Sequence, residues 1–204
     1  MFQRISMTLY QIKPAFQALL RPLMAWLYRH HITANQITLS AIVLSMVTGL
    51  ILTVFPLYFL LPVVLFVRMA LNALDGMLAR ECHQQSRLGA ILNETGDVIS
   101  DIALYLPFLF LADSSFLLVL TMLLAMMMTE FCGILAQTIN GVRSYAGPFG
   151  KSDRALVFGT WGLVLALWPQ AAHWSNIVWG IAVVLLLWTI VNRCQSALLV
   201  TVTK

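Results

Sequence analysis

The chain has 204 residues, of which 60% are hydrophobic and only 10% are charged, and its mean hydropathy is +0.87. This composition excludes an ordinary water-soluble domain, in which about a quarter of the residues carry charge. The formal net charge is +4. Nothing in the distribution of these charges favours nucleic acid, whereas their placement around apolar segments favours a membrane protein.

The N-terminal segment, residues 4–31, alternates basic and large apolar side chains at helical spacing, which gives a helix with one apolar face. Such a helix is typical of the membrane interface, so we expect residues 1–34 to lie there. A simple basic leader ahead of the first membrane span is the alternative. Thr33 or Asn35 has the chemistry to cap the helix that follows.

Six apolar segments come next, and each is long enough to cross the ~30 Å hydrocarbon core as a helix that rises ~1.5 Å per residue. They cover residues 36–55, 57–79, 89–112, 115–139, 155–172 and 175–192. Only the third and the fifth have marginal hydropathy, the third because it contains acidic residues. We therefore predict an all-α polytopic membrane protein of one domain, residues 1–204, with a six-helix bundle over residues 36–192.

Lysine and arginine set the expected orientation of this bundle. If the six segments alternate in direction, all but one of these residues fall on the same side of the membrane. They are Arg4, Lys13, Arg21, Arg29, Arg80, Arg87, Arg143, Lys151, Arg154, Arg193 and Lys204. Because positively charged loops stay in the cytoplasm, we expect both termini and the loops 80–88 and 140–154 to be cytoplasmic.

The exception, Arg68, lies within the second apolar segment. Asn72, Asp75 and Ala79 follow it at offsets of four, seven and eleven residues, which keeps all four on one face of a helix. Polar side chains at this depth are costly in lipid, so this face should point into the bundle.

A second polar stripe occupies the third segment, where Asn93, Asp97 and Asp101 recur every four residues with Glu94 beside them. Glu130 adds an acid in the fourth segment, either as part of a site or as a hydrogen-bonding group between helices. Because the second and third segments are antiparallel, their residues pair by depth. From the cytoplasmic side the expected levels are Asp75 with Asn93, Asn72 with Asp97, and Arg68 with Asp101.

Carboxylate and amide oxygens that converge from two helices suit a hard cation such as Mg²⁺ or Mn²⁺. The deepest level allows a second interpretation, because Arg68 and Asp101 could instead form a salt bridge. Both interpretations of Asp101 stay open from the sequence.

The order of these residues is specific: Asn72-Ala-Leu-Asp75-Gly76-Met-Leu-Ala79-Arg80, then eight residues, then Gly89-Ala-Ile-Leu-Asn93-Glu-Thr-Gly-Asp97. It closely resembles the signature of the CDP-alcohol phosphatidyltransferases, DxxDGxxAR, eight residues, GxxxDxxxD. The six-span layout extends the resemblance over nearly the whole chain, which looks like a small bacterial inner-membrane branch of that family. The resemblance implies transfer of a phosphatidyl group from CDP-diacylglycerol to an alcohol, with release of CMP, by a homodimer.

The resemblance also implies roles for individual residues. One or two Mg²⁺ or Mn²⁺ ions would be held by a set drawn from Asn72, Asp75, Asn93, Asp97 and Asp101. The CDP group would lie against Asn72, Asp75, Gly76, Ala79 and Arg80. Asp97 matches the family's fourth aspartate, the proposed general base that takes a proton from the acceptor hydroxyl.

Two positions depart from the family pattern, because Asn72 and Asn93 stand where it has its first and third aspartates. An amide oxygen can bind a metal ion but brings no charge, so Asp75 and Asp97 would be the only signature carboxylates. Glu94 and Asp101 could compensate. The other outcome is loss of catalysis, which would leave a protein that only binds a CDP-lipid.

The stretch from Gly141 to Arg154 is similar to the basic loop that several family members use for a phosphorylated acceptor. Arg143, Lys151 and Arg154 are therefore candidates for binding an acceptor phosphate, although membrane orientation explains the same charges. The acceptor is open among glycerol 3-phosphate, an inositol phosphate, serine and a second lipid. A transporter is the rival class, since charged residues within a membrane also build ion and substrate pathways.

Overall fold

The computed structural model describes residues 13–199, and helices joined by short segments account for almost all of this range. The α-helices are α1 Lys13–Arg29, α2 Ala34–Val54, α3 Leu60–Glu81, α4 Arg87–Tyr105, α5 Phe116–Asn140, α6 Lys151–Leu167 and α7 Ser175–Leu199. Two short 3₁₀ helices, η2 Leu106–Phe110 and η3 Pro169–Trp174, follow α4 and α6. The prediction of an all-α protein is confirmed.

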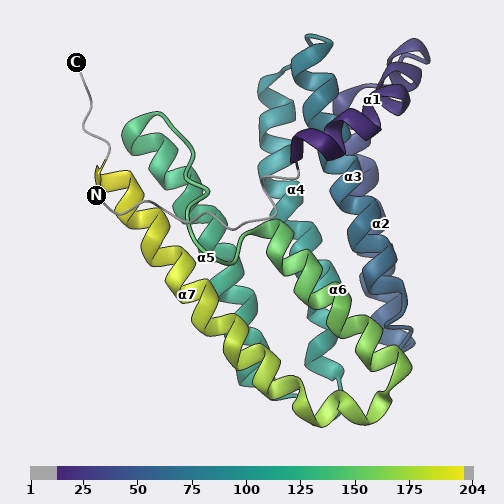
Figure 1. The fold of residues 1–204 in the computed structure, drawn as a ribbon, viewed down its shortest axis with the longest axis vertical. Coiled ribbons are helices and arrows are strands. Elements are labelled where there is room, and N and C mark those ends of the chain that lie inside the picture. The colour runs from purple at the N-terminus through teal and green to yellow at the C-terminus, as the bar shows by residue number, and fades with distance from the viewer. Residues whose placement is uncertain (1–12, 200–204) are drawn as a thin grey trace.

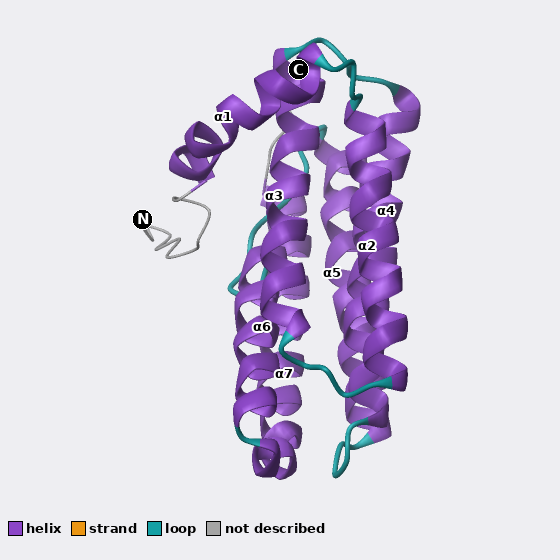
Figure 2. Ribbon diagram, turned by 90° about the vertical axis from the view of Figure 1, so that its right-hand side faces the viewer, coloured by secondary structure: helices purple, strands orange, loops and turns teal. Residues whose placement is uncertain are grey.

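Helices α2 to α7 run along the long axis of the molecule, and α1 lies across one end (Figures 1 and 2). α2 packs along both α3 and α4, α3 along α6, and α5 along α7, whereas α4 and α5 touch over a short stretch only. Large apolar side chains cover the outer faces of these helices, and most of the intrahelical charge is buried. This arrangement suits a lipid surrounding rather than water.

Four stretches of the described residues are long and apolar enough to cross a membrane: Ala34–Val54, Leu60–Glu81, Phe116–Asn140 and Pro169–Leu198. They correspond to α2, α3, α5 and η3 with α7, so the protein is polytopic. α4, which carries three acids, and α6, which has 17 residues, are not among them. These are the two segments whose hydropathy is marginal in the sequence, and a total of six spans stays a prediction.

Capping residues and prolines explain where the helices begin and end. Thr33 caps α2, because its hydroxyl accepts from the Gln36 N–H at 3.3 Å and the Gln36 side chain accepts from the Thr33 N–H at 2.8 Å. The third predicted segment, 89–112, ends as an α-helix at Tyr105, because Pro107 has no N–H to continue it. The fifth, 155–172, is observed as α6, which begins earlier, at Lys151, and ends at Leu167, before Pro169 and the short helix η3.

The predicted N-terminal helix is present as α1, and residues 1–12 of the predicted range lie outside the described residues. Its position at the membrane interface stays a prediction. α1 docks on the end of α3, where Leu27 packs with the buried Leu78 and Arg21 pairs with Glu81 at 3.0 Å. Leu19 of the same helix is 75% exposed. The helix therefore has one apolar side on the bundle and another that is available to lipid.

A glycine brings α2 and α4 into close contact. At Gly49 a Cβ atom would overlap the carbonyl oxygen of Ala103, so only glycine permits the observed approach of the two helices. This packing fixes α4 beside α2 and α3, and with it the direction in which the acids of α4 point.

The segment between α5 and α6, residues 141–150, turns back into the bundle instead of staying at its end (Figure 1). The Ser144 N–H bonds to the Gly133 carbonyl, two helical turns before α5 ends, and the Phe149 N–H bonds to the Thr189 hydroxyl on α7 at 3.0 Å. We expected a loop on the cytoplasmic side here. Because of this inward turn, α6 starts beside the middle of α4, and its first residues reach the acids of α4.

Candidate active site

The polar stripes of α3 and α4 point toward each other. The Arg68 guanidinium donates to the Asp101 carboxylate at 2.5 Å, and the Asn72 side-chain amide donates to Asp97 Oδ1 at 3.3 Å. These contacts join the two deeper levels expected from the sequence, so that pairing is confirmed. The seam between these helices is the centre of the candidate site.

Asp75, at the predicted outer level, is buried and takes part in no ion pair among the described residues. Its Oδ2 accepts from the Thr38 hydroxyl of α2 at 2.7 Å. Sequence reasoning missed Thr38, and the available signal was a hydroxyl on a face of an apolar helix that also carries Ala34 and Ala41. The hydrogen bond holds the Asp75 carboxylate in place without neutralising it.

Asp97 is the most contacted acid of the seam. Its Oδ1 meets the Lys151 ammonium, the Asn72 amide and, at 3.9 Å, the Arg68 guanidinium. Arg68 also donates to the Asp97 carbonyl oxygen at 3.0 Å, which fixes this turn of α4 to α3. The Asp97 side chain is 17% exposed, so it is still within reach of a ligand.

The residues expected to meet the CDP group occupy the last turns of α3. Arg80 is exposed, pairs with no carboxylate of the described residues, and lies over Gly76, where a Cβ atom would be 3.0 Å from its guanidinium. Ala79 is half-buried. Asn93, one turn before Asp97 on α4, makes no hydrogen bond with another described residue through its side chain. These positions leave a basic group and small side chains next to Asp75.

Asp101 is bound by two arginines, Arg68 at 2.5 Å and Arg154 of α6 at 2.7 Å. Arg154 has no exposed surface, and Arg68 is 2% exposed. Of the two interpretations left open by the sequence, the salt bridge is therefore present. A metal ion bound by Asp101 would have to share its carboxylate oxygens with these two guanidinium groups.

Glu130 of α5 gathers arginines from three other parts of the chain. It accepts from Arg143 at 2.9 Å and from Arg154 at 3.0 Å, and Arg193 of α7 lies at 3.5 Å. Sequence reasoning gave Arg193 only a place on the cytoplasmic side, and did not connect it with Glu130. We call Glu130 and these three arginines the arginine cluster.

All three candidates for the acceptor phosphate lie next to the seam, and each is paired with an acid. Arg143 contacts Glu94 as well as Glu130, Lys151 contacts Asp97, and Arg154 contacts Asp101 and Glu130. The Nε atoms of the three cluster arginines are nevertheless buried with no hydrogen-bond partner among the described residues. Unused donors of this kind are uncommon in a folded interior and suit an anionic ligand.

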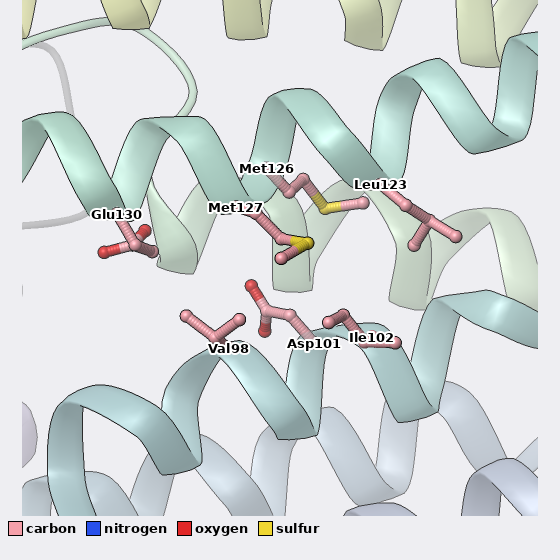
Figure 3. Close-up of a pocket in the computed structure, with 7 residues that line it drawn as sticks. All are labelled: Val98, Asp101, Ile102, Leu123, Met126, Met127 and Glu130. Atoms are coloured by element: carbon pink, nitrogen blue, oxygen red, sulfur yellow. The ribbon is translucent and has the colours of Figure 1, made fainter. Parts of the chain in front are cut away.

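A small pocket lies between α4 and α5, and Asp101 and Glu130 are the two acids that line it (Figure 3). Its lining comes from two helices only: Val98, Asp101, Ile102, Leu123, Met126, Met127 and Glu130. The Asp101 carboxylate points from α4 toward α5 in this view. Because the remaining lining is apolar, the pocket offers little to a hydrophilic substrate, and the seam between α3 and α4 is the better candidate site.

The donors of the seam are of the chemical kind that binds a divalent ion. Asp75 and Asp97 supply hard carboxylate oxygens, and the amide oxygens of Asn72 and Asn93 are of the same chemical kind. Among the described residues, however, no group of three or more His, Cys, Asp or Glu side chains is arranged to hold a metal ion. Asn72 also uses its amide N–H toward Asp97, a contact that an aspartate could not make.

Comparison with known proteins identifies relatives of the chain. The sequence model of the family described as CDP-alcohol phosphatidyltransferase matches residues 31–191. The inner membrane protein YnbA of Escherichia coli strain K12 is 70% identical over 198 residues, which cover 96% of this chain and 98% of YnbA.

Solved structures of the phosphatidylinositol phosphate synthase PgsA1 of Mycobacterium tuberculosis share the fold. The complex with manganese and citrate and the complex with CDP-DAG both superpose with a TM-score of 0.74 at 23% identity. They cover 87% of this chain and 88% and 92% of their own chains. With the match over most of the sequence, the chain belongs to the CDP-alcohol phosphatidyltransferase family.

Proposed function

We propose that the protein is an integral-membrane transferase that moves a phosphatidyl group from CDP-diacylglycerol to an alcohol and releases CMP. The observation that carries this proposal is the position of Asp75 and Asp97. Both signature carboxylates lie at the α3–α4 seam, close enough to interact electrostatically, and Asp75 has only a neutral hydroxyl as a side-chain partner. Family membership supports the transferase over the transporter.

Asp75 and Asp97, with the amide oxygens of Asn72 and Asn93, would hold Mg²⁺ or Mn²⁺. When bound, such an ion neutralises the charge of the diphosphate and of the transition state of phosphoryl transfer. Manganese in one PgsA1 structure and CDP-DAG in another support both ligands for this chain.

The residues of the chain supply the remaining chemistry. Asp97 takes the proton of the acceptor hydroxyl on Oδ2, because the contacts of its side chain with Lys151, Asn72 and Arg68 all fall on Oδ1. The acceptor oxygen then forms a bond to the lipid-linked phosphorus. The bond from this phosphorus to the CMP oxygen breaks, and its electron pair leaves with CMP.

Two basic groups of residues orient the substrates in this proposal. Arg80 binds the diphosphate of the CDP group above Gly76, because it is exposed and has no acid partner among the described residues. Arg143, Lys151 and Arg154 bind a phosphate on the acceptor. These three would exchange part of their contacts with Glu94, Asp97, Asp101 and Glu130 for the acceptor.

Purified protein in lipid nanodiscs tests the activity directly. With CDP-diacylglycerol, Mn²⁺ and a panel of alcohols, we expect CMP release with at least one acceptor and a new phospholipid identified by mass spectrometry. The panel contains glycerol 3-phosphate, an inositol phosphate, serine and a lipid alcohol. Binding of CDP-diacylglycerol without CMP release from any of them would instead identify a relative that binds CDP-lipid and does not catalyse transfer.

For the whole molecule we propose a homodimer in a bacterial inner membrane, with six spans and both termini in the cytoplasm. The name of the E. coli relative and the one-sided Lys and Arg residues support this arrangement. Reporter fusions after Asp113 and after Lys204 should then lie in opposite compartments. Finding both fusions on the same side of the membrane would contradict the six-span topology.

A further inference from the structure

Lys151 places a positive charge at the seam. It is the first residue of α6, and its ammonium contacts Asp97 Oδ1, the oxygen that also accepts from Asn72. The Lys151 side chain is 22% exposed and that of Asp97 is 17% exposed, so a ligand can still reach this ion pair. The ammonium is also near enough to Asp75 to interact with it electrostatically.

This lysine occupies a position that a helix does not favour for a cation. The N-terminus of a helix carries partial positive charge, which favours acidic residues and disfavours basic ones in the first turn. Asp153 supplies the favourable acid there, since its carboxylate accepts from the Gly150 N–H at 2.9 Å. Lys151 therefore gains nothing from the helix end, and its carboxylate partner on α4 offsets the unfavourable location.

The backbone before α6 holds Lys151 in this place. Gly147 has a φ of +119°, which favours glycine, and a Cβ atom there would be 2.6 Å from the Thr189 side chain. Two residues later, the Phe149 N–H donates to the Thr189 hydroxyl at 3.0 Å. The segment is thus fixed against α7, and the start of α6 follows from it.

The charge at the seam limits what else can bind. Two carboxylates, Asp75 and Asp97, face the Lys151 ammonium, and Arg68, whose shorter contact is with Asp101, also lies 3.9 Å from Asp97 Oδ1. At most one negative charge of the two carboxylates is therefore left uncompensated, and the charge of a single divalent ion already exceeds it. Metal ions in two-metal sites lie about 3.5–4 Å apart, so a second ion would be repelled by both the first ion and the ammonium.

We infer that Lys151 is the resident second cation of the site. Its ammonium binds Asp97 and, with its remaining N–H donors, a phosphate oxygen of the acceptor, so that the chain uses one divalent ion together with Lys151. The loss of acidic charge at Asn72 and Asn93 is consistent with this arrangement, because an ammonium and one divalent ion require fewer carboxylates than two divalent ions. The inference rests on the proposed function for the identity of the phosphate alone.

Binding of Mn²⁺ to purified protein without substrate tests the inference. Electron paramagnetic resonance of free Mn²⁺ gives the number of bound ions and their affinity. We expect at most one Mn²⁺ per chain in the unaltered protein. Removing the ammonium with Lys151→Gln should tighten Mn²⁺ binding at least about tenfold or add a second ion, because a positive charge next to Asp97 is lost. Lys151→Arg, which keeps the charge, should bind Mn²⁺ as the unaltered protein does.

Arg87 provides the matched control. It is the first residue of α4, as Lys151 is of α6, but it is exposed and pairs with no carboxylate of the described residues. Arg87→Gln should leave Mn²⁺ binding unchanged. Two Mn²⁺ ions in the unaltered protein, no Mn²⁺ binding in any variant, or equal affinities in Lys151→Gln and the unaltered protein would each overturn the inference. CMP release is not part of this readout, so a failed transferase proposal would be recognised separately.

Discussion

The α3–α4 seam and the arginine cluster are neighbouring charged regions that are built in opposite ways. In the seam, Asp75 has the Thr38 hydroxyl as its one side-chain hydrogen-bond partner among the described residues, and Asp97 has a lysine, an amide and a more distant arginine on a single oxygen. In the cluster, one carboxylate, Glu130, is surrounded by three arginines, which come from the 141–150 segment, from α6 and from α7. Asp101, between the regions, is held by two arginines.

The carboxylates of the seam can exchange their partners for a ligand, whereas the buried arginines cannot lose theirs without a large loss in the free energy of unfolding. In the seam, the carboxylate of Asp75 has only a neutral side-chain partner, and that of Asp97 is partly exposed with one oxygen free of side-chain contacts among the described residues, so both can bind a metal ion or a proton at small cost. A buried arginine that loses its acid keeps an uncompensated charge, which is strongly destabilising. We therefore expect changes in the seam to alter chemistry at nearly constant stability, and changes at Asp101 and Glu130 to alter stability first.

The largest expected effect comes from the seam. Asp75→Asn and Asp97→Asn each remove a carboxylate that holds the metal ion or accepts the proton, so CMP release should fall by at least about 10³-fold. Insertion into the membrane should be unaffected. Asp113→Asn, at an exposed acid outside the bundle, is the control. Full activity of either seam variant would remove the metal assignment and most of the case for a transferase.

The next effect concerns Asp101 and separates the two regions by stability. Asp101→Leu leaves both Arg68 and Arg154 without this partner, and we expect the free energy of unfolding to fall by about 3–5 kcal/mol. Adding Arg68→Met should recover part of the loss. Recovery should be incomplete, because Arg154 then depends on Glu130 and Thr129.

Denaturation of the detergent-solubilised variants measures this loss. The exposed pair of Arg21 with Glu81 is the control, since Arg21→Met should cost about 1 kcal/mol or less. An Asp101→Leu protein that is as stable as the Arg21→Met protein would show that the buried pairs do not hold the bundle together.

Sequence periodicity was enough to predict the seam. A spacing of four residues keeps Arg68 and Asn72 on one face of α3, and the same spacing keeps Asp97 and Asp101 on one face of α4. The antiparallel direction of the two helices then sets which residues meet, and the observed contacts join Asn72 with Asp97 and Arg68 with Asp101. Regular helices make this kind of prediction possible, because depth follows directly from residue number.

The arginine cluster could not be predicted in the same way. Its pairing depends on the inward turn of residues 141–150, which has no periodicity, and on the register of α5 against α7. From the sequence, Arg143 and Arg193 look like ordinary cytoplasmic anchors, since the positive-inside rule does not distinguish a surface charge from one that folds back. Thr38 was missed for a related reason, because hydroxyls are common in apolar helices and few of them bind an acid.

Arg143 offers a smaller effect that tests whether the cluster also binds a substrate. It is the cluster arginine whose second acid, Glu94, is 28% exposed. Arg143→Gln should raise the KM of a phosphorylated acceptor about tenfold or more, because it removes a hydrogen bond between two charged groups. The KM of CDP-diacylglycerol should stay near its original value. Arg29→Gln, at an exposed base on α1, is the control. Equal changes for both substrates would indicate that Arg143 serves membrane orientation and packing only.

The smallest expected effect comes from restoring the family's aspartates at the seam. Asn72→Asp exchanges an amide that donates to Asp97 Oδ1 at 3.3 Å for a second carboxylate at the same place, so the two acids repel each other until a cation binds. Asn93→Asp adds its charge one turn away from Asp97 on the same helix. The double variant should therefore bind Mn²⁺ several-fold to about tenfold more tightly, since affinity for hard cations rises with ligand charge. Titration with Mn²⁺ measures this gain, and in the Lys151→Gln background it should be larger, because the ammonium no longer competes for the added charge. No gain in either background would mean that positions 72 and 93 do not face a metal ion in this chain.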